Sequence, residues 1–110
     1  MGYTNYWHQH NDISSENWKK IKKEYTDYVL PIAGKNIIDS STDDIIKFDG
    51  GCETFYFAKY SKKEVDRRYP EEDLSFNFCK TRAGTYDIYV WYLLSYINKI
   101  DPSISISRDY

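Results

Sequence analysis

The chain has 110 residues, a net charge of −2 and two cysteines, and 41% of its residues are apolar. This length and composition predict a single globular domain over residues 1–110 and argue against a disordered chain. The slightly negative charge makes nucleic acid a poor candidate for the main partner, and no apolar run approaches the length that spans a membrane. Cys52 and Cys79 match no zinc motif, so we expect reduced thiols in a cytosolic protein without a cofactor.

Residues 1–12 are polar and aromatic, and we expect an irregular N-terminal arm or a short edge strand there. A helix is predicted over residues 14–31, with Ser14 as its N-cap and with Pro31 and Gly34 ending it. The apolar residues of this segment recur at helical spacing and form one stripe. They are Trp18, Ile21, Tyr25, Tyr28, Val29 and Ile32.

Two strands follow, over residues 44–48 and 54–60, and Asp49-Gly50-Gly51 between them is typical of a hairpin turn. Residues 74–81 form a third predicted strand. Its alternation predicts that the apolar side chains face the core, namely those of Leu74, Phe76 and Phe78. The side chains of Ser75, Asn77, Cys79 and Thr81 would then face the other way.

A second helix is predicted over residues 85–99, and a last strand over residues 103–107 points Ile104 and Ile106 into the core. The apolar stripe of this helix comprises Tyr86, Tyr89, Val90, Leu93, Leu94 and Ile97. The order helix, three strands, helix, strand predicts an α+β two-layer sandwich. Its two helices would cover one face of a mainly antiparallel sheet of about four strands. The other face would be polar with aromatic residues such as Tyr56 and Tyr60, and would be simply hydrated or serve as a dimer or ligand surface.

The junction between the third strand and the second helix gathers polar side chains at a helix N-terminus, where an anion can bind. The structural alternative is that Thr85 caps the helix, Lys80 pairs with Glu53 or Asp87, and Arg82 is solvated. Either way, we expect the junction to lock strand to helix with Glu53 as its cross-strand partner. The candidate ligand-binding residues are Lys80, Thr81, Arg82, Thr85, Tyr86, Glu53 and Asp87.

Two further patterns indicate chemistry. His8, His10 and Asp12 alternate, so a strand would place them on one face as three ligands for a divalent metal; the alternative is a pair of surface histidines. Cys79 lies beside Lys80 and near a helix N-terminus, where a thiolate nucleophile can be stabilised; the alternative is an inert buried thiol.

The segments Cys52-Glu53-Thr54-Phe55 and Phe78-Cys79-Lys80-Thr81…Tyr86-Asp87 resemble an uncharacterised family of small proteins from tailed phages and large DNA viruses. The N-terminal Trp7-His8…Asn11-Asp12-Ile13-Ser14 is similar as well. Where the family pattern has Ala-Arg-Lys-Pro, this chain has Arg82-Ala83-Gly84-Thr85, so one basic residue of an anion site is lost and the other moves. The resemblance implies a viral origin and no particular activity.

These observations lead us to expect a small viral accessory protein in the host cytoplasm. It would bind a host protein or a small anionic ligand such as a nucleotide without catalysis, and the sheet face could also form a homodimer. Two alternatives stay open. One is a structural virion component, and the other is a compact hydrolase or nuclease that uses His8, His10, Asp12 and Glu53.

Overall fold

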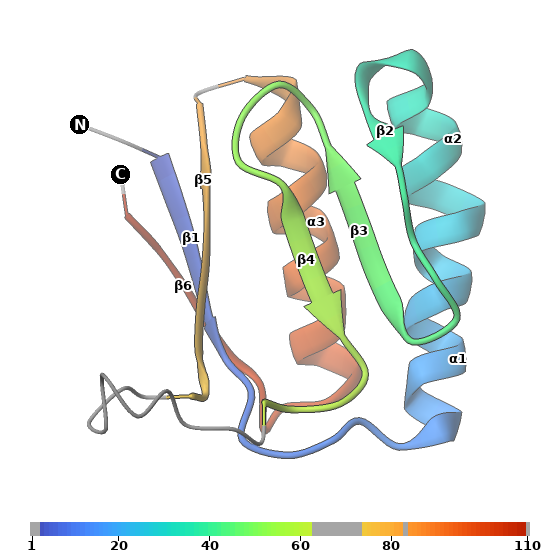
Figure 1. Cartoon of the computed structure of the whole chain (residues 1–110), viewed down its shortest axis with the longest axis vertical. Coiled ribbons are helices and arrows are strands. Elements are labelled where there is room, and N and C mark those ends of the chain that lie inside the picture. Colours follow the sequence, from blue (N-terminus) through green and yellow to red (C-terminus); the bar gives the residue numbers. More distant parts are fainter. Residues whose placement is uncertain (1–2, 63–73, 83, 110) are drawn as a thin grey trace.

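The computed structural model describes residues 3–62, 74–82 and 84–109 of the chain (Figure 1). Within these residues the fold is α+β, with two main helices and two small antiparallel sheets of three strands each. Sheet A has the strand order β5-β1-β6, and sheet B has the order β2-β3-β4. The predicted α+β class is confirmed, but the predicted single four-stranded sheet is wrong.

Sheet A is built around the N-terminal strand. Its strands are β1 (Tyr3–His8), β5 (Phe76–Thr81) and β6 (Ser105–Asp109). Trp7 of β1 lies opposite Asn77 on one side and Ile106 on the other, so β1 is the central strand. The expected irregular arm or edge strand is therefore corrected: the Tyr, Thr and Trp residues of this segment favour a pleated, half-buried strand. β5 is an edge strand of sheet A and does not pair with β4, which belongs to sheet B.

Sheet B contains the predicted hairpin. Its strands are β2 (Ile38–Asp39), β3 (Ile45–Asp49) and β4 (Phe55–Ala58). Phe55 and Phe57 are buried and Tyr56 is exposed, as the alternation predicts. Gly51 in the turn has a φ of +91°, which favours glycine, and its N–H donates to Asp49 Oδ1 at 3.0 Å.

The first helix is longer than predicted and changes its pitch along the way. It runs through α1 (Ser15–Glu24), the π-helical η1 (Tyr25–Val29), α2 (Leu30–Ala33) and the 3₁₀ turn η2 (Gly34–Asn36). Ser14 is the N-cap, as predicted, because its hydroxyl accepts from the N–H of Asn17 at 3.1 Å. Pro31 does not end the helix; the wide turn before it tolerates a residue without an N–H. The α-helical part ends at Ala33, and the predicted stop Gly34, with a φ of +53°, is its C-cap before the 3₁₀ turn.

The π turn also divides the predicted apolar stripe. Trp18, Ile21, Tyr25 and Val29 are buried, whereas Tyr28 is 55% and Ile32 is 72% exposed. A π turn holds an extra residue, so the side chains beyond it rotate relative to a regular 3.6-residue repeat. The second predicted helix, α3 (Thr85–Ile100), has no such interruption, and all six residues of its predicted stripe are buried.

The side chains of β5 face opposite to the prediction. Phe78 is 52% exposed, while Cys79 and Thr81 are buried. The register pairs Cys79 with Asn5, which is also buried, so the odd-numbered residues of β5 point inward. A strand shifted by one residue exchanges its two faces, and pairing with β1 decided which face became the inner one.

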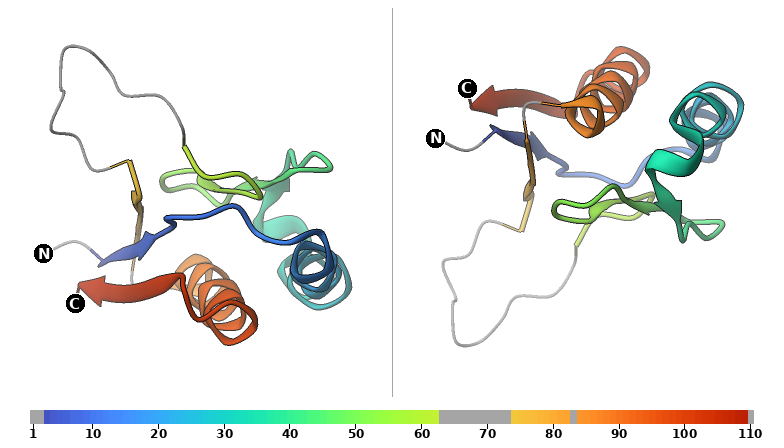
Figure 2. Two further views of the ribbon diagram at one scale, coloured as in Figure 1. Left: turned by 90° about the horizontal axis from the view of Figure 1, so that it is seen from below. Right: turned by 90° about the horizontal axis from the view of Figure 1, so that it is seen from above.

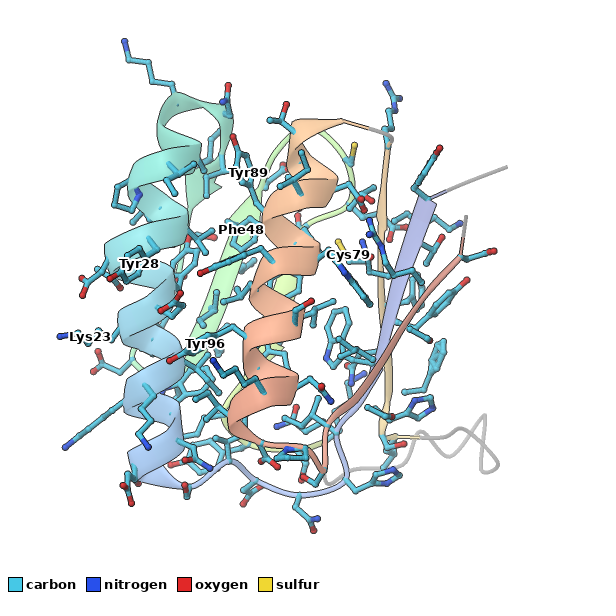
Figure 3. All side chains as sticks on the ribbon, turned by 180° about the vertical axis from the view of Figure 1, so that it is seen from behind. Lys23, Tyr28, Phe48, Cys79, Tyr89 and Tyr96 are labelled. Atoms are coloured by element: carbon cyan, nitrogen blue, oxygen red, sulfur yellow. The ribbon has the colours of Figure 1, made fainter. Side chains whose placement is uncertain are left out.

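Aromatic rings join the layers. Viewed along the helices, α1 and α3 lie side by side, and β6 is next to α3 (Figure 2). Trp7 of sheet A packs on Phe55 of sheet B with ring centroids 5.3 Å apart, and Phe55 stacks on Phe48 at 5.0 Å. Figure 3 shows Phe48 between the two helices and Cys79 on the other side of α3.

Among the described residues, no helix is long and apolar enough to cross a membrane.

Candidate functional site

Glu53 connects the start of β4 to the end of β5. Its carboxylate Oε2 accepts from the backbone N–H of Lys80 at 2.8 Å, and its own N–H donates to the Lys80 carbonyl at 3.3 Å. The structure therefore places Glu53 beside Lys80 as expected, but its partner is the Lys80 backbone rather than the ammonium group. Glu53 thus hydrogen-bonds both backbone groups of Lys80 at the edge of β5 and links the two sheets.

Tyr86 fills the space beneath the hairpin turn. Its hydroxyl donates to the Glu53 carbonyl at 2.7 Å. A Cβ atom on Gly50 would lie 2.1 Å from Tyr86 Cδ1, so the turn needs glycine there to let the ring approach.

Cys79 lies next to Tyr86, and its Sγ is 3.5 Å from the Glu53 carbonyl oxygen. Burial is the main cause that raises the pKa of its thiol to about 12. At neutral pH Cys79 is a protonated thiol, which does not act as a nucleophile.

Asp87 is the centre of a polar network in sheet A and α3. Its Oδ1 accepts from Thr81 Oγ1 at 2.5 Å and from Asn5 Nδ2 at 3.0 Å, and its Oδ2 pairs with the guanidinium of Arg108. Arg108 Nε also donates to Asn5 Oδ1 at 3.1 Å, and the guanidinium lies over the Trp91 ring. Burial alone would raise the pKa of Asp87, but these hydrogen bonds and the Arg108 charge hold it below its usual value.

Apart from Glu53, the predicted ligand-binding residues fall into two groups. Thr81, Tyr86 and Asp87 are buried and bonded to other protein groups, whereas the side chains of Lys80, Arg82 and Thr85 are exposed. Within the described part of the chain, no hydrogen bond or ion pair joins the exposed three to one another. Thr85 is not the N-cap; Gly84 takes that position, without a side-chain cap.

The predicted metal ligands do not form a cluster. The rings of His8 and His10 stack with centroids 6.1 Å apart, while Asp12 Oδ1 accepts from the N–H and the hydroxyl of Ser61 at 2.9 and 3.0 Å. Asp12 lies beyond the end of β1, so the strand alternation that would align the three residues does not extend that far. Across residues 3–62, 74–82 and 84–109, no group of three or more His, Cys, Asp or Glu side chains is arranged to hold a metal.

An open groove lies where the edges of the two sheets diverge, between β4 and β5. It has a volume of about 480 Å³, and we call it the inter-sheet groove. Its described lining combines aromatic rings with a few polar side chains: Trp7, Thr54, Tyr56, Lys62, Phe76, Asn77 and Phe78. Sequence reasoning assigned Tyr56 and Asn77 to a candidate binding face but placed Phe76 and Phe78 in the core. Trp7 was not predicted as part of the site, because the sequence of a single strand does not indicate which distant strands it will pair with.

A second hollow, of about 130 Å³, lies between the helices and is lined by Tyr28, Val29, Ile32, Ile88, Tyr89 and Tyr92. The lining that these described residues expose to the hollow is apolar, and the hydroxyl of Tyr92 is directed to Glu24. Unlike the described lining of the inter-sheet groove, it contains no lysine or amide side chain.

Comparison of the chain with models of protein families, with curated proteins and with solved structures found no match. The geometry of the described residues is therefore the basis for a functional proposal.

Proposed function

We propose that this protein is a non-catalytic binding protein and that it takes its ligand in the inter-sheet groove. The observation that carries the proposal is the lining of that groove. Its volume falls in the range of about 300–1,000 Å³ that is typical of ligand sites, and aromatic walls with a small number of polar groups are the usual composition.

The groups that would support a catalytic alternative are engaged elsewhere. The Glu53 carboxylate accepts the Lys80 N–H, and Asp12 accepts from the N–H and the hydroxyl of Ser61, so both carboxylates have structural hydrogen bonds. The Cys79 thiol is buried and has a raised pKa. Binding is the function that leaves these contacts intact.

The resemblance to small phage and large DNA virus proteins adds a context to this proposal. A viral accessory protein in the host cytoplasm would meet a host protein or a small anionic ligand. Lys62, in the wall of the groove, suits the charge of such a ligand. Tyr56, which is 46% exposed, and Phe78 provide surfaces on which a planar or apolar group can pack.

Thermal unfolding of the whole chain with millimolar mononucleotides, cyclic dinucleotides and short synthetic peptides tests this function. Ligand binding to the native state raises the unfolding temperature. We expect a stabilising compound to lose its effect in Tyr56→Ser and Phe78→Ser. It should keep its effect in Tyr28→Ser, a matched control that removes an equally exposed ring on the helical side. A compound that stabilises all three variants as well as it stabilises wild type would contradict the assignment to this groove.

A further inference from the structure

We propose that the occupant of the inter-sheet groove is an extended, acidic segment of a partner protein, which pairs as an added strand with the edge of β5 that faces β4. This inference rests on the proposed binding function and names the class of partner. It follows from which backbone groups of β5 and β4 are already bonded and from the charge of the groove lining.

The register of β5 shows which of its backbone groups point away from β1. In an antiparallel pair, residues that bond to the partner strand alternate with residues whose N–H and C=O point outward. The N–H of Gln9 donates to the Ser75 carbonyl at 2.8 Å, which makes these two a bonded pair. The alternation then directs the backbone groups of Phe76, Phe78 and Lys80 toward β4.

The outward groups of Lys80 confirm this assignment, because both of them bond to Glu53. Those of Phe76 and Phe78 have no backbone partner on this side among the described residues. A strand edge with unpaired N–H and C=O groups is a template for an added strand, and β-strand addition is a common way to bind an extended peptide.

The facing edge of β4 forms the other wall. The N–H of Lys59 donates to the Asp44 carbonyl at 2.9 Å, so the alternation turns the backbone groups of Tyr56 and Ala58 outward. Gln9 Nε2 already donates to the Ala58 carbonyl at 2.9 Å. The two edges are thus connected by Glu53 at one end and by Gln9 at the other, and the open stretch lies between these connections.

The side chains define the chemistry of the guest. Lys62 is the one charged side chain among the described residues of the groove lining, which favours a guest with a carboxylate. Phe76 and Phe78 alternate to the outer face of β5 together with the exposed Lys80. A short segment that carries apolar side chains on its outer face and an acidic residue near Lys62 therefore complements this site.

The test uses a phage-displayed library of random heptapeptides, panned on the whole chain. Selected peptides are synthesised, and their affinities are measured by fluorescence polarisation. We expect acidic peptides with alternating apolar residues. Lys62→Glu should weaken their binding about three- to tenfold, while Lys19→Glu, an exposed lysine of α1 outside the groove, should change it less than about twofold.

Backbone N-methylation of the selected peptide distinguishes strand pairing from side-chain contact without changing the protein. Methylation of every second amide should weaken binding by about tenfold or more, and methylation of the intervening amides should leave it within about threefold. The amide protons of Phe76 and Phe78 should also gain protection from hydrogen exchange in the complex.

Three outcomes would overturn the inference. If no peptide is enriched, or if methylation has the same effect at every amide, the guest is not an added strand. Groove-dependent stabilisation by a nucleotide would then still support the proposed function. If enriched peptides bind Tyr56→Ser and Phe78→Ser as tightly as wild type, the peptides do not occupy the groove and the inference fails; the proposed function fails as well only if no compound shows groove-dependent stabilisation.

Discussion

The two ends of β5 differ in how their polar groups are satisfied. Near Thr81, the strand is bonded on both edges, and the side chain is held by Asp87. Near Phe76 and Phe78, one edge has no backbone partner among the described residues, and the aromatic rings border a groove. The comparison teaches that a junction rich in reactive side chains can have a structural role, and it is the open end of the strand to which we assign the proposed binding site. Four predictions test it.

The largest effect is expected where the closed end is broken. Asp87→Ala removes the carboxylate that pairs with the guanidinium of Arg108, a side chain that is only 17% exposed. Loss of one partner from a buried ion pair costs about 3–5 kcal/mol of unfolding free energy, measured by urea denaturation. The control is Asp27→Ala, which removes an exposed pair with Lys23 and should cost less than about 1 kcal/mol. Equal losses would show that the network does not hold the junction.

The two faces of β5 provide the second test. Thr81→Val removes a hydroxyl that donates to a buried carboxylate, and it should cost about 1.5–3 kcal/mol. Phe78→Ala removes a larger side chain that is half exposed, and it should cost less than about 1 kcal/mol. Urea denaturation of both variants measures the difference. A greater loss from Phe78→Ala would mean that the inward face is the one expected from the sequence.

Gly50 and Gly84 give a matched pair for the contact beneath the hairpin. Gly50→Ala places a methyl group in the Tyr86 ring and should cost about 1–3 kcal/mol through overpacking. Nothing lies within 4 Å of a Cβ on Gly84, so Gly84→Ala meets no clash and should cost only about 0.5–1 kcal/mol, because glycine is preferred over alanine at an N-cap. If the two variants unfold alike, the close approach of Tyr86 is not required.

The smallest effect is a difference in acid sensitivity. The pKa of Asp87 is lowered in the folded protein, so the ionised carboxylate adds stability above its unfolded pKa of about 3.8. This contribution is lost as the pH falls through the folded pKa. We expect the urea midpoint of wild type to fall more steeply below about pH 4 than that of Asp87→Asn. Parallel curves would show that Asp87 does not titrate with folding.

Local patterns predicted the elements whose partners are close in sequence. The Ser14 cap, the β3–β4 hairpin and the stripe of α3 each depend on residues within a few turns or one hairpin, so their signals are complete in the sequence. The path of the first helix past Pro31 was missed, because a π turn has no distinct composition.

Local sequence patterns predicted only part of the candidate site. The sequence by itself determined that Phe78–Asp87 would be a strand-to-helix junction beside Glu53, because turn, cap and alternation signals are local. Only the tertiary structure decided that the N-terminal strand would enter sheet A between β5 and β6. Pairing with β1 turned the odd-numbered residues of β5 inward and buried Thr81 against Asp87, and the opposite edge has no backbone partner at Phe78 within the described residues. Pairing between residues 68 to 78 positions apart is set by the burial of whole faces, which no local window contains.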